Sequence, residues 1–394
     1  MMFAIMLRFA LAIFAVGAAT AQDARQLHDD AFVFDAHVHI SNRQFTDGGD
    51  IGQRYSDGQV DLPRIREGGV DALFYTLGIS EKYYPGRFET KQSLRLIDHA
   101  LSQIEKHDDI ELALSADDIE RINSSGKIAA VLDIEGGYDM DGDLGVLRML
   151  HRLGLRSLQL PAHNWTNEFA DSCCAPPKWG GINETGEAFI REMNRLGMII
   201  NISHSSDETV EQALDVSEDP LVATHHGLRH YNDIPRVMPD ELLRKLAAKG
   251  GLIGFHIGHS FHSRKFFDWK TKRDNRPFWD TSTVEESVAG MSIFDVDRSL
   301  EGRYPSVGPI PPDELYMTPD DWLERVEYAI DLVGENHVIL GTDFDGAPTP
   351  PKGMNDISDL PVLTQAMVRR GWSEERIRKF LGLNLLRVFR KVTQ

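Results

Sequence analysis

Residues 34–41 read FDAHVHIS, an apolar stretch that carries two histidines two positions apart. In an extended strand alternate side chains face the same way, so His37 and His39 would converge while Ala36 and Val38 face away. Neutral imidazole is a common ligand of divalent metals, which makes this stretch a candidate for one end of a metal site. The same pattern also fits an ordinary buried strand, and only the surrounding sequence separates the two interpretations.

Seven further apolar runs accompany the one that contains this motif, and helical patterns separate them. The eight strand candidates are Phe32–Ile40, Val70–Leu77, Ile128–Ile134, Leu155–Pro161, Met198–Ile202, Leu221–Thr224, Gly251–Ile257 and Val338–Gly341. Strands that alternate with helices over one domain length predict an α/β fold of the (β/α)8 TIM-type barrel class. The runs are nearly continuous, which is typical of parallel strands covered on both faces. A doubly wound sheet remains the structural alternative.

Periodicity and capping signals predict several of the intervening helices. Apolar periodicity indicates helices at Thr185–Leu196, Pro239–Ala248 and Leu360–Arg370. Capping-box spacing marks three further helix starts, at Ser115 with Asp118, Ser205 with Glu208, and Thr318 with Asp321.

One long segment, residues 262–316, breaks this alternation. It is rich in charged residues, aromatics, Pro and Gly and shows little clear periodicity. Connections this long in a compact domain tend to be lids or insertions. The segment follows the seventh predicted strand, where a barrel places loops that face the substrate. We therefore expect an insertion or lid, with a mobile decoration as the alternative.

The N-terminus predicts export. Residues 1–21 contain one charge, Arg8, then an apolar run and a small-residue cleavage site, Ala19-Thr20-Ala21, which together read as a signal peptide. The apolar run is short for a bilayer-spanning anchor, which is the alternative. We expect a periplasmic or secreted protein whose barrel occupies residues 22–394, without a membrane anchor, because the C-terminus ends in charged and polar residues.

Charge and cysteine content limit the partners. The formal net charge of −19 argues against nucleic acid or an anionic membrane as a partner, because both are polyanions. The two cysteines, Cys173 and Cys174, are neighbours in sequence. Neighbouring cysteines are awkward to join, so free thiols or a labile vicinal bridge are expected rather than a structural staple.

Reactive side chains recur near the ends of the predicted strands. They are His37 and His39, Glu135, His163, His204, His225 and Asp343. Each has an ordinary structural explanation by itself, such as a helix cap or a turn. In a barrel, however, the carboxyl ends of all strands open onto one face, so these side chains would meet.

The joint pattern predicts a two-metal hydrolytic site. Four imidazoles, from His37, His39, His204 and His225, and the carboxylate of Glu135 as a bridge suit two transition-metal ions such as zinc. Two close ions acidify a shared water and polarise a carbonyl. Asp343 would take the proton of this water and pass it to the leaving amine. Arg236 could hold a substrate carboxylate, although a surface ion pair is the commoner role of an arginine.

Several longer motifs resemble the renal-type membrane dipeptidase family of zinc metallopeptidases. They are QVDLPRIREGGVDALF at 59–74, EGG at 135–137, REMNRLGM at 191–198, SH at 203–204, DFDG at 343–346, and RRGWSEE and LGLNLLRVF within 369–389. The resemblance implies a (β/α)8 barrel that holds two zinc ions. It also implies hydrolysis of dipeptides, with a D-residue tolerated at the C-terminal position.

The resemblance also assigns roles to individual residues. It implies that Glu135 bridges the two ions, that His37 belongs to the first zinc, and that His204 and His225 hold the second. By the same resemblance Asp343 transfers the proton, and the substrate contacts are His163 and, in RVMPDE, Arg236. A homodimer is compatible with the family.

The chain departs from the family at two places. The opening motif of the family usually reads His-x-Asp, whereas His39 stands at its second ligand position here and removes one negative charge. Residues 262–316 also form a longer segment than the family implies.

These features lead to one principal expectation and two alternatives. We expect a dizinc metallopeptidase, with Asp343 and Glu135 as catalytic residues, that hydrolyses small dipeptides through a metal-bridging hydroxide. His39 and the long segment motivate the first alternative, a metal-dependent amidohydrolase acting on an N-acyl amino acid, a lactam or a peptide-derived metabolite. The second is a binding or maturation protein that keeps the barrel without turnover.

Overall fold

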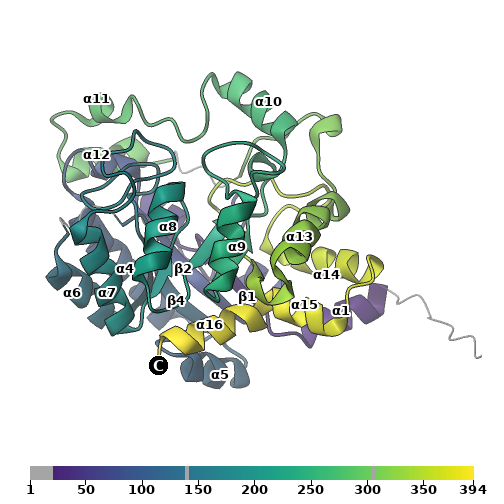
Figure 1. Ribbon diagram of the computed structural model, residues 1–394. Coiled ribbons are helices and arrows are strands. Elements are labelled where there is room, and N and C mark those ends of the chain that lie inside the picture. The colour runs from purple at the N-terminus through teal and green to yellow at the C-terminus, as the bar shows by residue number, and fades with distance from the viewer. Residues whose placement is uncertain (1–20, 138–141, 303–306) are drawn as a thin grey trace, which may run out of the picture.

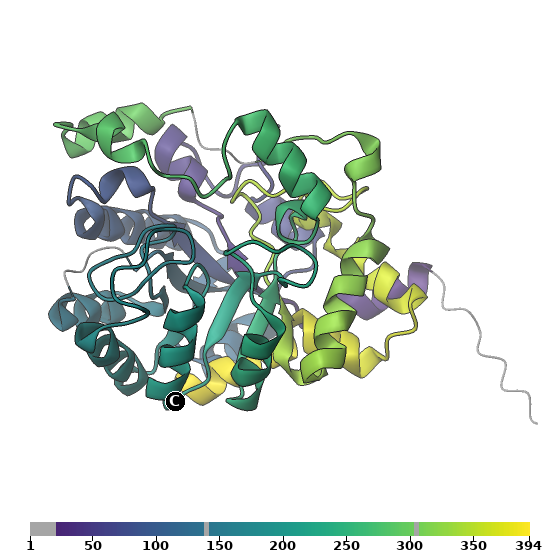
Figure 2. The same ribbon diagram turned by 45° about the horizontal axis from the view of Figure 1, so that its top comes forward.

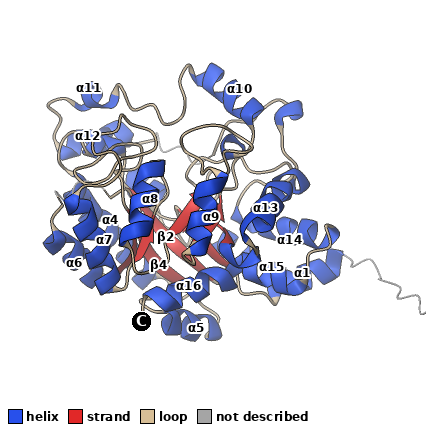
Figure 3. Ribbon diagram, in the orientation of Figure 1, coloured by secondary structure: helices blue, strands red, loops and turns tan. Residues whose placement is uncertain are grey.

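Parallel strands form the centre of the structure and helices surround them (Figures 1 and 3). The computed structural model describes residues 21–137, 142–302 and 307–394. The strands are β1 (Phe34–Val38), β2 (Ala72–Gly78), β3 (Ile110–Leu112), β4 (Ile128–Glu135), β5 (Leu155–Gln159), β6 (Ile199–Asn201), β7 (Val222–His226), β8 (Leu252–Phe255) and β9 (Val338–Leu340). Their hydrogen-bonded order is β1-β2-β4-β5-β6-β7-β8-β9, and every pairing is parallel.

This consecutive order is that of a (β/α) barrel and excludes the doubly wound sheet, whose strand order reverses at a switch point. All eight predicted strands are present. The additional strand β3 pairs with the start of β4. Sequence patterns missed it because its three residues, IEL, include a charged side chain and are too short for a recognisable apolar run.

The ring nearly closes between β1 and the residues that follow β9. The backbone N–H of Asp343 donates to the His37 carbonyl at 2.9 Å, and that of His39 donates to the Phe344 carbonyl at 3.1 Å. The buried Asp35 carboxylate reinforces this seam: it accepts from the backbone N–H of Thr342 at 2.9 Å and from the Thr342 hydroxyl at 2.6 Å. It also accepts from the backbone N–H of His37 at 3.1 Å.

Alternate residues of β4 show how the barrel positions the site. Ala129 and Val131 belong to a buried cluster with Phe34 of β1 and Phe389 of the C-terminal helix, which lies across the lower end of the barrel in Figure 1. The same face of the strand continues upward, because side chains alternate with a period of two, and ends at Glu135. The last side chain on this face of β4, at the upper end of the barrel, is therefore the carboxylate of Glu135.

Sixteen helices lie within the described ranges. Those that belong to the barrel and its ends are α1 (Ala21–Asp29), α2 (Asn42–Asp47), α3 (Leu62–Glu67), α4 (Glu89–Lys106), α5 (Ala116–Ser124), α6 (Leu144–Arg152), α7 (Glu184–Leu196), α8 (Asp207–Val216), α9 (Asp240–Ala248), α13 (Pro319–Val333), α14 (Leu360–Arg369), α15 (Glu374–Arg378) and α16 (Asn384–Val392).

Two of the three predicted capping boxes mark the observed starts. Ser115 caps α5, and Thr318 and Asp321 form a reciprocal box at the start of α13. The third prediction is wrong by one residue, because Ser206 rather than Ser205 caps α8 and accepts from the backbone N–H of Thr209. Adjacent serines gave the sequence two similar capping choices.

In its described part, the segment 262–316 contains three α-helices rather than only irregular chain. They are α10 (Arg264–Asp274), α11 (Val284–Val288) and α12 (Ile293–Leu300). These helices lie beyond the upper end of the barrel in Figure 1 and along its rim in Figure 2, where that end is turned toward the viewer. The helical periodicity of α10 was hard to recognise because charged residues dominate it.

The predicted signal peptide falls almost entirely outside the described residues. Within the described part of the chain, no helix has both the length and the apolar character needed to cross a bilayer.

The Asp35 seam generates a stability prediction. Replacing Asp35 with Ala leaves three buried donors without a partner, and we expect the free energy of unfolding to fall by about 3 kcal/mol. Asp35→Asn is the matched control, since its side-chain oxygen still accepts from the backbone and it should lose markedly less. Urea denaturation followed by circular dichroism measures both, and equal stability of Asp35→Ala and wild type would contradict the seam's importance.

Candidate metal centre

Glu135 ends β4, and its carboxylate is the centre of the site. Its Oε1 atom lies 3.2 Å from Nε2 of His204, 3.2 Å from Nε2 of His225 and 3.5 Å from Nε2 of His37. Its Oε2 atom lies 3.3 Å from Nε2 of His39. The structure thus brings together all five residues that the sequence predicted as metal ligands.

Backbone strain accompanies this convergence. Three predicted site residues follow strand ends with a left-handed backbone: His163 (φ 56°), His204 (φ 63°) and Asp343 (φ 63°). Residues other than glycine rarely adopt this conformation, and it persists where the surrounding structure enforces it, often at functional sites.

The Glu135 carboxylate is ionised, and two of the imidazoles beside it, those of His204 and His225, are neutral. Burial favours the neutral acid, but the charges of His163 and His37 hold the pKa of Glu135 well below its usual range. Burial lowers the pKa of His204 and His225 well below that of a free imidazole, and nearby positive charges add to this effect. Neutral imidazoles therefore face an ionised carboxylate.

The outer nitrogens of the imidazoles are held by neighbouring side chains. Nδ1 of His204 donates to the side-chain oxygen of Asn164 at 3.1 Å, which leaves the lone pair of this histidine on Nε2. Nδ1 of His37 and of His225 lie 3.2 and 3.1 Å from the Thr224 hydroxyl. Nε2 of His37 is buried without a hydrogen-bond partner among the described residues. The lone pair of His204 thus points at the Glu135 carboxylate, an arrangement that a divalent cation would stabilise, and the donor set fits a transition metal.

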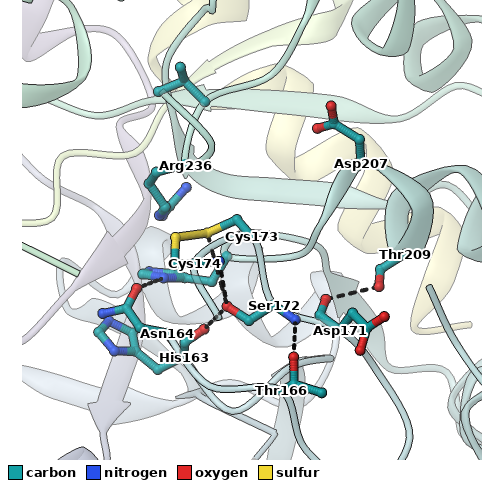
Figure 4. The surroundings of a disulfide bond; sticks show 12 residues. His163, Asn164, Thr166, Asp171, Ser172, Cys173, Cys174, Asp207, Thr209 and Arg236 are labelled. Atoms are coloured by element: carbon teal, nitrogen blue, oxygen red, sulfur yellow. Dashed lines mark hydrogen bonds between the residues drawn. A yellow bond between two sulfur atoms is a disulfide. The ribbon is translucent and has the colours of Figure 1, made fainter. Parts of the chain in front are cut away.

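A disulfide loop supports two of the site residues (Figure 4). Cys173 and Cys174 are joined in the loop after β5, so the vicinal bridge is present rather than free thiols. The backbone N–H of Cys173 donates to the His204 carbonyl at 2.7 Å, and the hydroxyl of Ser172 donates to the His163 carbonyl at 2.9 Å. The loop therefore holds the backbone at two strained positions.

Asp343 has different partners on its two oxygens. Oδ1 lies 3.1 Å from Nε2 of His39, and Oδ2 lies 3.0 Å from Nε2 of His256. Nδ1 of His256 accepts from the backbone N–H of Gly258 at 2.7 Å, so its proton is on Nε2 and is donated to Asp343. Burial opposes ionisation of Asp343, but the hydrogen bonds of His256 and His39 hold its pKa well below the usual range.

His163 lies at the edge of the site, between the carboxylates of Glu81 and Glu135. Its Nδ1 atom lies 2.7 Å from Oε1 of Glu81, and its Nε2 atom lies 3.7 Å from Oε1 of Glu135. Burial works against protonation, but the charges of Glu81 and Glu135 outweigh it and raise the pKa of His163. The two carboxylates therefore favour the protonated ring, and its Nε2 atom faces Glu135 in the site.

Arg236 lies beside the site but is covered. Its side chain is fully buried, and its Nη2 atom donates to the His225 carbonyl at 3.0 Å. Its guanidinium lies 4.9 Å from the centroid of the Phe261 ring, while Nε and Nη1 have no hydrogen-bond partner in the described part of the chain. Burial lowers the pKa of Arg236 to about 9. Arg236 thus offers unused donors behind an aromatic ring rather than in the open cavity.

The centre opens into a cavity of 860 Å³. His39, Glu135 and Asp343 line one part of its wall, and residues from α10 and the chain after it line another. A volume of this size accommodates a drug-sized ligand.

Comparison with known proteins agrees with this geometry. Residues 21–394 match the membrane dipeptidase family, peptidase family M19. The chain belongs to this family. It is therefore a metallopeptidase of the dipeptidase class, and the resemblance seen in the sequence is confirmed.

One curated relative and two solved structures illustrate the similarity. Dipeptidase tcpJ of Claviceps purpurea is 30% identical over 348 residues, which cover 85% of this chain and 69% of the relative. The structure of the probable dipeptidase PvdM from Pseudomonas aeruginosa is 22% identical, with a TM-score of 0.78 over 95% of this chain and 98% of that one. A metallo peptidase from Rhodobacter sphaeroides, liganded with a phosphinate mimic of the dipeptide L-Ala-D-Ala, is 22% identical, with a TM-score of 0.73 over 92% and 100%.

Three supporting residues of this dipeptidase were missed from the sequence: Glu81, Asn164 and His256. His256 directly follows β8, so the strand-end rule that found the other histidines could have found it too. Asn164 is adjacent to His163 and carried no separate signal. Glu81 lies in a short 3₁₀ turn after β2, where nothing in the sequence distinguishes it from a surface acid.

Metal content tests the ligand set. If His204 and His225 share one ion with Glu135, His204→Ala should reduce bound zinc from about two ions per chain to about one. His230→Ala, which changes an exposed histidine, is the matched control and should keep both. Elemental analysis of purified protein measures the ratio, and unchanged zinc in His204→Ala would remove this residue from the ligand set.

A second prediction concerns His256. Since it holds one oxygen of Asp343, His256→Phe keeps a ring to stack on Phe261 but removes the N–H, and kcat should fall about 10- to 100-fold. KM and metal content should stay near wild type, because neither the substrate contacts nor the ligands change. His256→Gln, which retains an N–H, should recover part of the rate. A loss of metal in the Phe variant would instead indicate a purely structural role.

Proposed function

We propose that this protein is a dizinc dipeptidase that hydrolyses the peptide bond of small dipeptides by activated water. The observation that carries the proposal is the convergence of four imidazoles on the two oxygens of Glu135, with the ionised Asp343 beside them at the floor of an open cavity. Family membership supplies the dipeptide substrate class.

The family resemblance suggests two sets of three ligands. His37 and His39, which lie together at the end of β1, would hold one ion, and His204 and His225 would hold the other. Glu135 would belong to both: its Oε2 atom lies near His39, and its Oε1 atom lies near His37, His204 and His225. Imidazole nitrogen and carboxylate oxygen are ordinary zinc ligands. Two zinc ions held by these residues would lower the pKa of a bound water, so that it can attack as hydroxide, and would polarise the substrate carbonyl.

The protein's own groups move the protons and orient the substrate. Asp343 is ionised and its Oδ2 atom is held by His256, so it can accept the proton of the attacking water and deliver it to the leaving amine. His163, oriented by Glu81, can donate its Nε2 proton to the carbonyl oxygen as negative charge develops there. These roles agree with those that the family resemblance implies.

In this proposal Arg236 binds the C-terminal carboxylate of the substrate. Its two unpaired donors support this role, because a buried guanidinium without a partner gains from an anionic ligand. Contact requires the Phe261 ring to move from its position over the guanidinium. We further propose tolerance of a C-terminal D-residue, supported by the L-Ala-D-Ala mimic bound to the Rhodobacter sphaeroides protein.

Export and assembly form a separate part of the proposal. The predicted signal peptide in residues 1–21 supports a periplasmic or secreted enzyme, and N-terminal sequencing of the mature protein would test cleavage after Ala21. A homodimer is compatible with the family, and sedimentation equilibrium would test it.

Chelation and one substitution test the reaction. A chelator should abolish hydrolysis of a dipeptide panel that includes L- and D-residues at the C-terminal position, and added zinc should restore it. Asp343→Asn should lower kcat by about 10²- to 10⁴-fold while zinc content is unchanged, because the amide cannot carry the proton. Release of amino acids measures the rate. If zinc-loaded wild type leaves the whole panel intact, the dipeptidase assignment is wrong, and full activity of Asp343→Asn would overturn the proton transfer.

A further inference from the structure

The cavity wall contributed by α10 has the opposite charge to the rest of the molecule. The chain carries a formal net charge of −19, yet residues 264–276 contain six basic and two acidic side chains. Lys270, Arg273 and Arg276 from this stretch line the same cavity as the catalytic centre. Lys270 and Arg273 are three positions apart and so share one face of the helix.

Aromatic packing fixes this face toward the cavity. Phe266 and Phe267 of α10 are buried, and the Phe267 ring stacks on Trp279 with centroids 5.3 Å apart. Phe278 in turn stacks on Phe261 at 5.7 Å, and Phe261 lies over His256. Ring contacts therefore connect the helix to Phe261, which stacks on His256, the residue holding Asp343.

Among the described residues, Lys270 and Arg276 of this wall have no carboxylate within ion-pair distance, and Lys270 is the more buried of the two. Its Nζ atom lies 5.1 Å from the centroid of the Phe278 ring, and no carboxylate lies within ion-pair distance of it among the described residues. The two arginines differ: Arg273 pairs with Asp274 at 2.6 Å, and Arg276 reaches the backbone carbonyl of Asp280 at 3.5 Å. Burial lowers the pKa of Lys270, which reflects a desolvated ammonium that an anion would stabilise.

We infer that the α10 wall is an anion-binding subsite, centred on Lys270, and that the preferred substrates carry a side-chain carboxylate in addition to the C-terminal one. The inference rests on the proposed dipeptidase activity and adds a substrate class to it. The 860 Å³ cavity leaves room for a side chain that extends from the metal centre to this wall. A local positive potential on an acidic protein also draws anionic peptides toward the cavity against the general repulsion.

Matched peptide pairs test the subsite. Ala-Asp is compared with Ala-Asn, and Asp-Ala with Asn-Ala, so that each pair differs only in one charge and the two pairs distinguish which residue of the dipeptide faces α10. In the zinc-loaded wild type, kcat/KM for the acidic member of one pair should exceed that for the amide by about tenfold. The preference should shrink at high ionic strength because salt screens the charges.

Substitutions on one helix supply the control. Lys270→Met keeps the length of the side chain without the charge, and it should lose the acidic preference while hydrolysis of Ala-Ala is unchanged. Lys272→Met removes a charge from an exposed position of α10 outside the cavity wall and should keep the preference. Equal rates for both members of both pairs in wild type, or an undiminished preference in Lys270→Met, would overturn the inference.

A binding measurement separates this inference from the proposed function. Calorimetric titration of the acidic peptide and its amide into chelator-treated protein should show tighter binding of the acidic peptide, and Lys270→Met should abolish the difference. If no peptide is hydrolysed but this difference is present, the dipeptidase proposal fails and the subsite stands. If Ala-Ala is hydrolysed and neither rates nor binding respond to the carboxylate, the subsite fails and the dipeptidase proposal stands.

Discussion

The hydrogen bonds between β1 and residues 342–344 are the constraint on which the site depends. They join the first strand of the barrel to the residues after the last one, across most of the chain length. The buried Asp35 carboxylate secures the same seam through Thr342. Because His37, His39 and Asp343 all lie on these two segments, the contacts that close the barrel also place a pair of ligands beside the proposed proton carrier. The same backbone hydrogen bonds therefore join the ends of the barrel and set the positions of these three site residues.

The second organising feature is the electrostatic balance around Glu135. An ionised carboxylate in a buried position needs a compensating positive charge. The neutral imidazoles of His204 and His225 do not supply one, whereas a bound metal ion would. His39 is a partial exception. Burial lowers the pKa of His39, but the hydrogen bond with Asp343 and the charge of Glu135 outweigh burial and raise that pKa to about 9. The resemblance implies an aspartate at this position. His39 therefore places a positive charge beside Glu135 and Asp343 when no metal is bound.

The part of the molecule that departs most from the sequence expectation is residues 262–316. Its helices form part of the cavity that contains the centre, and α10 gives that part of the wall a positive charge. The overall charge of −19 indicated only which partners were excluded. Net charge averages over the whole surface, whereas a ligand responds to the few groups that line its cavity. The sequence shows that α10 is basic, but only the structure shows that its basic residues line the cavity of the candidate metal centre.

The sequence by itself determined the barrel class and the family, and it predicted the residues that the structure brings together around Glu135. The strands were recognisable as continuous apolar runs, and most strand ends carried a reactive side chain such as His204 or Glu135, so the local pattern and the fold rule agreed. Tertiary structure decided what those residues touch. Three of these contacts join segments far apart in the chain: His256 with Asp343, Glu81 with His163, and Phe261 with Arg236. No local sequence pattern encodes such contacts. The stretch FDAHVHIS predicted two histidines on one side of a strand. Only the tertiary structure shows that both of them face Glu135, because Glu135 lies about a hundred residues further along the chain.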